Sequence, residues 1–66
     1  MVDFVAVDFK PLKGGVPDVD DIKAANYALK VLSDRAGFDA VLPSQPFRQE
    51  RDGVWFYTIV WEKVER

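Results

Sequence analysis

Apolar residues dominate the first stretch of the chain, residues 2–10. This stretch is rich in β-branched and aromatic residues, carries apolar side chains at both odd and even positions, and ends at Pro11. The pattern predicts a β-strand over residues 2–10. Residues 11–17 contain two prolines and a Gly-Gly pair, which predict a loop.

The spacing of apolar residues changes to a helical period after this loop. The apolar stripe consists of Ile22, Ala25, Leu29, Leu32 and Ala36. Asp18 or Asp20 can cap free backbone N–H groups at the start, and carboxylates are favourable near the positive end of the helix dipole. Gly37 occupies the position where helices commonly end in a left-handed residue. The sequence therefore predicts an amphipathic helix between residues 18 and 37.

Three strands are predicted after the helix. Residues 38–42 form a short apolar run that stops at a Pro-Ser-Gln-Pro segment. Residues 47–51 and 54–64 flank Asp52-Gly53, a pair preferred in two-residue type I′ hairpins because both central residues need positive φ. The expected fold is a single α+β domain over residues 1–66. It is a two-layer sandwich of β-α-β-β-β order, in which a mostly antiparallel sheet with short middle strands packs against one helix.

The long last strand departs from the pattern expected of a sheet with one covered face. A two-layer sandwich should leave one sheet face polar, so its strands should alternate between apolar and polar residues. Residues 54–61 are instead apolar on both faces, and residues 2–9 repeat this pattern. One helix can cover only one face of a sheet. The sequence therefore predicts an apolar sheet face that some other structure must cover.

The residues expected opposite the last strand indicate which face is turned outward. In the predicted hairpin register, the odd-numbered residues share a side with Arg48 and Glu50, and the even-numbered residues share a side with Phe47. Because Arg48 and Glu50 are charged, we expect the even-numbered side to meet the helix. The outward stripe, our candidate partner-binding site, then consists of Trp55, Tyr57, Ile59 and Trp61, with Arg48 placed over an aromatic ring.

Two other interpretations of this stripe stay open. In the first, the sheet curls and the loops 11–17 and 43–46 fold over the stripe, so that its aromatic residues are ordinary core. In the second, the stripe and Arg48 hold a small planar ligand, or two or three bases of a single strand, because every base has a π-face.

Composition and charge narrow the classes of function. The 66 residues are 48% hydrophobic and 14% aromatic, which favours a folded domain, and they include neither Cys nor His, so disulfides and zinc, haem or iron–sulfur sites are not expected. A net charge of −2, spread evenly along the chain, argues against binding to DNA or to an acidic membrane surface. No signal peptide or membrane helix is indicated, so we expect a cytoplasmic protein, or a viral product in the host cytoplasm.

The residues that usually carry catalysis are scarce. General bases are most often His and reactive nucleophiles often Cys, and the chain contains neither. Asp18, Asp20 and Asp21 lack the spacing of a calcium loop and are explained by helix capping. No motif assigns the chain to a family. We therefore expect a non-enzymatic module without a cofactor, which forms homo-oligomers or docks on a larger protein as its regulator or inhibitor, with a planar-ligand-binding oligomer as the alternative.

Overall fold

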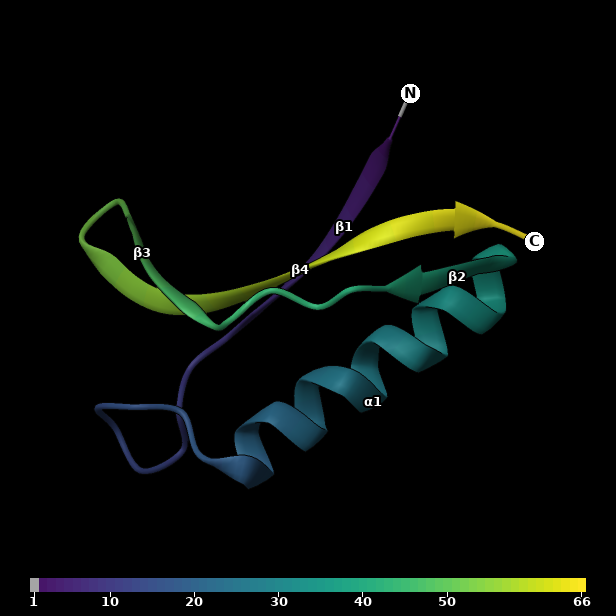
Figure 1. Ribbon diagram of the computed structural model, residues 1–66. Helices are drawn as coiled ribbons and strands as arrows, with labels where there is room; N and C mark the ends of the chain where they lie inside the picture. The colour runs from purple at the N-terminus through teal and green to yellow at the C-terminus, as the bar shows by residue number, and fades with distance from the viewer. Residues whose placement is uncertain (1) are drawn as a thin grey trace.

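A computed structural model describes residues 2–66 of the chain (Figure 1). These residues form one helix and four strands in the order β-α-β-β-β, and the helix packs on an antiparallel sheet, so the predicted fold class is confirmed. The elements are β1 (Asp3–Phe9), α1 (Val19–Ala36), β2 (Phe38–Val41), β3 (Phe47–Arg51) and β4 (Val54–Glu65).

β4 is the central strand of the sheet. β1 pairs with it along one side, from Asp3 opposite Lys63 to Phe9 opposite Tyr57. On the other side, β3 pairs with residues 54–58 and β2 with residues 62–65, so these two strands lie end to end along β4. The last strand is therefore central, and residues 47–51 lie at an edge of the sheet. Figure 1 shows β4 running through the sheet above α1.

Both ends of the helix are closed by the residues that the sequence indicated. The N–H of Asp21 donates to the Asp18 carboxylate at 3.0 Å, and the N–H of Asp18 donates to the Asp21 carboxylate at 3.0 Å, which forms a capping box. Gly37 adopts a left-handed conformation with φ of 78°, and its N–H donates to the carbonyl of Ser33. These local contacts explain why α1 starts after Asp18 and ends at Gly37.

The Asp18 cap stabilises the fold by an amount that depends on pH. The hydrogen bond from the N–H of Asp21 is the main cause that holds the pKa of Asp18 below its ordinary value of 3.8. A carboxylate with a lowered folded-state pKa stabilises the fold above its unfolded pKa, and this contribution is lost as the pH falls through the folded pKa.

We therefore expect the melting temperature to fall below about pH 4, partly through Asp18. Melting curves followed by circular dichroism between pH 2 and pH 7 measure this. Asp18→Asn is the matched control, because asparagine still caps a helix but does not titrate. Its melting temperature should fall less over the same acid range, and an identical acid response in both proteins would contradict a role for Asp18.

The core lies between α1 and the half of the sheet that contains the C-terminal part of β4. The buried side chains of the core cluster are Ala25, Leu29, Phe38, Ile59 and Trp61, and the half-buried side chains packed against them are Val5, Val7, Phe9, Ile22 and Ala40. The strands carry apolar residues on both faces, but only one face contributes to this small core.

The buried stripe of the helix is narrower than predicted. Leu32 is 46% exposed and Ala36 is exposed, so the prediction that these two residues belong to the buried stripe is wrong. The residues that α1 buries recur every four positions, at Asp21, Ala25, Leu29 and Ser33. A sheet only three strands wide under the helix explains this single row. Ser33 tolerates burial because its hydroxyl donates to the carbonyl of Lys30 at 3.0 Å.

The turn between β3 and β4 has the predicted type and register. Asp52 and Gly53 both have positive φ, 54° and 78°, as a type I′ turn requires. Arg51 lies opposite Val54 and Arg48 lies opposite Tyr57, as expected from a two-residue loop.

Candidate protein-interaction surface

The four side chains of the predicted outward stripe lie on the face that the helix covers. Ile59 is 2% exposed and Trp61 is 4% exposed, and both belong to the core beneath α1. Trp55 and Tyr57 follow on the same face and are half-buried. The prediction that the even-numbered residues of the last strand meet the helix is therefore wrong.

The strand used for that prediction explains the error. β3 pairs only with residues 54–58, whereas the helix packs over Ile59 and Trp61. The polar residues of β3 are therefore neighbours of a part of the sheet that lies beside the core, and they do not indicate which face the helix covers. The apolar residues of β1 and β2 on this face decide the question, because Val5 and Val7 lie opposite Trp61 and Ile59. Their pairing joins segments more than fifty residues apart, which no local pattern shows.

An aromatic cluster remains at the end of the sheet nearest the β3–β4 turn. The rings of Phe9 and Tyr57 lie 6.2 Å apart between centroids, and those of Trp55 and Tyr57 lie 6.1 Å apart in an edge-to-face arrangement. The guanidinium of Arg48 lies 5.0 Å from the centroid of a Trp55 ring, which confirms the prediction that Arg48 covers an aromatic side chain. Sequence reasoning missed Phe9, because its place in the cluster depends on the register of β1.

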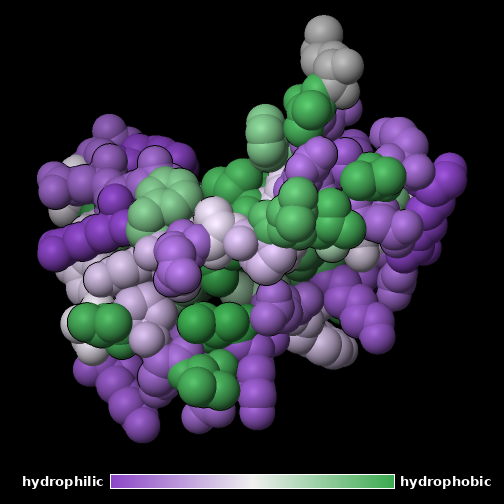
Figure 2. Space-filling view, viewed as in Figure 1, coloured by the Kyte–Doolittle hydropathy of each residue, from purple (hydrophilic) through white to green (hydrophobic). Residues whose placement is uncertain are grey.

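The opposite face of the sheet carries apolar side chains interspersed with polar ones, and the helix does not cover it. Residues opposite one another on neighbouring strands share a face, so the even-numbered residues of β4 define this surface together with their partners. We call it the open face, and its apolar residues are Phe4, Ala6, Val41, Phe47, Val54, Phe56, Val60 and Val64. Phe4 is 66% exposed. Figure 2 shows uncovered apolar side chains over the strands, with hydrophilic side chains around them.

A polar group at the middle of the open face joins three strands. Gln49 donates from Nε2 to the hydroxyl of Thr58 at 2.7 Å, and this hydroxyl donates to the carboxylate of Asp8 at 2.8 Å. Thr58 is buried beneath its neighbours although it points away from the helix. The hydroxyl thus accepts one hydrogen bond and donates another, and the group connects β3, β4 and β1.

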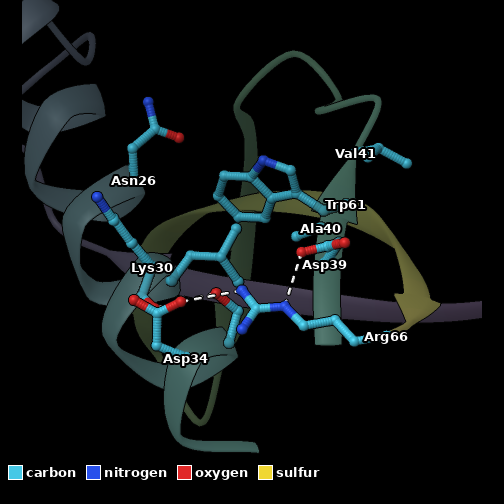
Figure 3. Close-up of a pocket in the computed structure, with 10 residues that line it drawn as sticks. Asn26, Lys30, Asp34, Asp39, Ala40, Val41, Trp61 and Arg66 are labelled. Atoms are coloured by element: carbon cyan, nitrogen blue, oxygen red, sulfur yellow. Dashed lines mark hydrogen bonds and ion pairs between the residues drawn. The ribbon is translucent and has the colours of Figure 1, made fainter. Parts of the chain in front are cut away.

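A shallow groove of about 460 Å³ separates α1 from β2 (Figure 3). The guanidinium of Arg66 lies across it and donates to Asp34 and to Asp39, both at 2.9 Å. These hydrogen bonds, first that to Asp34, raise the pKa of Arg66 above its ordinary value. Figure 3 shows the indole of Trp61 at the inner wall. Trp61 is almost fully buried, so the groove offers no open aromatic face, and Arg66 is paired with both carboxylates. Lys30 also lines the groove.

Within residues 2–66, no three His, Cys, Asp or Glu side chains lie close enough together to hold a metal ion. Within the same residues, no helix is long and apolar enough to cross a membrane.

Comparison of the chain with protein-family models, with curated proteins and with solved structures finds no match.

Proposed function

We propose that this protein is a non-enzymatic protein-interaction module that associates with another copy of itself or docks on a larger protein, as its regulator or inhibitor. The observation that supports this function is the open face. Soluble monomers rarely leave a contiguous apolar patch larger than a few hundred Å² uncovered, and such patches commonly mark interfaces. The two phenylalanines at the edges of the face, Phe4 and Phe47, are both exposed.

The charges around the open face favour a protein partner over a nucleic acid. Asp8 and Glu62 project from the same side of the sheet, whereas the basic residue on this side, Arg51, packs over the ring of Phe56 at 5.1 Å. Phosphate groups would be repelled by these carboxylates. A partner that presents an apolar surface with a basic rim fits this arrangement.

The geometry of the aromatic cluster also favours a protein partner over a planar ligand. The rings of Trp55 and Tyr57 meet at 84°, so they leave no slot between parallel rings. Arg48 already covers one face of the Trp55 indole. Small-molecule sites are usually concave and bury most of their ligand, whereas a sheet face matches a broad protein surface.

Charged substitutions on the open face test the proposal. We expect the double variant Phe47→Lys and Val64→Lys to lose capture of a partner from lysate of the native host at least tenfold, because each lysine would bury an unpaired charge at the interface. Capture on immobilised protein, quantified by mass spectrometry, measures this. Both side chains are about half-exposed, so the variant should stay folded by circular dichroism.

The matched control is the double variant Leu12→Lys and Tyr27→Lys. It also replaces two exposed apolar side chains by lysine, but in the loop before α1 and on the helix. Its captured proteins should match those of the unchanged chain. Equal capture by the open-face variant would contradict the proposed function.

A further inference from the structure

β1 has an outer edge beside which no other strand of residues 2–66 lies (Figure 1). Proteins usually protect such edges with charged residues, proline, bulges or very short strands, because an unpaired strand edge is a template for another strand. β3, an edge strand on the other side, carries Arg48, Glu50 and Arg51 among its five residues. The middle of β1, Phe4–Val7, contains no charge and no proline. β1 is therefore the unprotected edge.

The turn at Asp52-Gly53 determines which backbone groups of β4 point toward each neighbour. The residues that flank a two-residue hairpin loop, here Arg51 and Val54, form a hydrogen-bonded pair, and such pairs recur at every second residue. The even-numbered residues of β4 thus direct their N–H and C=O groups away from β1. Val60 agrees with this, because it exchanges hydrogen bonds with Ser44 on that side, at 2.8 and 3.0 Å.

The same alternation identifies the free backbone groups of β1. The odd-numbered residues of β4 point toward β1, and their partners are the odd-numbered residues of β1, from Asp3 opposite Lys63 to Phe9 opposite Tyr57. Phe4, Ala6 and Asp8 therefore direct their N–H and C=O groups outward along the free edge. This row of donors and acceptors has the same spacing as the row that bonds to β4.

We propose that this edge pairs antiparallel with β1 of a second copy of the chain, with Ala6 of one copy opposite Ala6 of the other. In this register Phe4 lies opposite Asp8 at both ends, so all three outward residues of each copy find a hydrogen-bonded partner. The two Asp8 carboxylates lie at opposite ends of the paired segment, so they do not repel each other. The edge is thus complementary to itself under a two-fold axis.

The side chains beside this edge also favour a second copy. Val5 lies opposite Val7 of the other copy in the same register, and both are only half-buried in the single chain. Their pairing covers apolar surface on the side of the helix. On the other side, Phe4 and Ala6 belong to the open face, so the open faces of the two copies become continuous. This pairing rests on the proposed function, because it names a second copy of the chain as one partner. It uses the backbone of β1, whereas the proposed function relies on the side chains of the open face.

Proline at position 6 tests the pairing. The N–H of Ala6 points outward, so Ala6→Pro removes a donor that the fold does not use, and proline is tolerated on edge strands in this orientation. Sedimentation equilibrium of the unchanged chain at micromolar to millimolar concentration should give twice the chain mass of 7.5 kDa, and Ala6→Pro should give the single mass. Ala6→Ser, which keeps the N–H, should stay dimeric. A monomeric unchanged chain, or a dimeric Ala6→Pro variant, would overturn the proposal.

A cysteine at the same position gives a second test that does not depend on folding of the proline variant. Opposite residues of a hydrogen-bonded antiparallel pair have Cα atoms about 5.5 Å apart, within the range that a disulfide spans. Ala6→Cys should therefore cross-link to completion under mild oxidation, whereas Val64→Cys on the central strand should not. Absence of the Ala6→Cys cross-link overturns the proposal. The variant with lysine at positions 47 and 64 should stay dimeric, so failure of the edge and failure of the open face give different results.

Discussion

Trp61→Ala is expected to unfold the protein at room temperature. Trp61 is 4% exposed and packs in a core that contains few other large side chains. Truncation of a buried tryptophan to alanine costs about 3–5 kcal/mol, and a single core in a domain of this size rarely supplies more than about 3–5 kcal/mol of stability. Far-UV circular dichroism and urea titration measure the loss of structure. The variant should lack a cooperative transition.

Trp55→Ala is the matched control for this prediction. It removes the same side chain from the same strand and the same face, at a position outside the core. This variant should stay folded, and its remaining tryptophan, Trp61, should show the blue-shifted emission of a buried indole. If Trp61→Ala melts like the unchanged chain, or if Trp55→Ala is the variant that unfolds, the arrangement of β4 against α1 described above is wrong.

Asp21→Asn is expected to have the second largest effect, a loss of about 1–3 kcal/mol in the free energy of unfolding. Asp21 is 5% exposed, and its two carboxylate oxygens accept hydrogen bonds from the N–H groups of Leu12, at 3.1 Å, and of Asp18, at 3.0 Å. Asparagine has only one carbonyl oxygen. Its amide would turn a donor toward one of these two donors and leave a part-buried N–H without an acceptor.

Asp20→Asn separates this effect from the loss of a negative charge at the start of the helix. Asp20 lies in the same turn but is exposed, and both variants remove one carboxylate near the positive end of the dipole. Urea unfolding of the two variants should differ by most of the expected loss. Equal stability of Asp20→Asn and Asp21→Asn would contradict the role of Asp21 as the acceptor that ties the loop to α1.

The features that were predicted correctly depend on residues close together in the chain. Asp18 and Gly37 close the helix through contacts within one turn, and Asp52-Gly53 sets the hairpin by its own backbone conformation. A local sequence contains all the information that these interactions need. The order of the elements follows directly, because each boundary is marked by such a signal.

The features that were not predicted depend on pairing between distant segments. The two-sided apolar pattern of the last strand correctly indicated a sheet face without a helix, but which face that is depends on the pairing of β1, whose residue Val7 lies opposite Ile59. The bridge from Arg66 to Asp34 and Asp39 joins residues about thirty positions apart. An exposed arginine and two exposed aspartates give no sequence signal of such a contact.

The central position of β4 also has a consequence for the order in which the protein folds. Within residues 2–66, β1, β2 and β3 each pair with β4 and not with one another. The hairpin with β3 closes a short loop, whereas Asp8 must find Thr58 fifty residues away, at a larger cost in chain entropy. We therefore expect the hairpin to form first and β1 to join last. Until then both backbone edges of this largely apolar strand are unpaired, and aggregation during refolding should begin at β1.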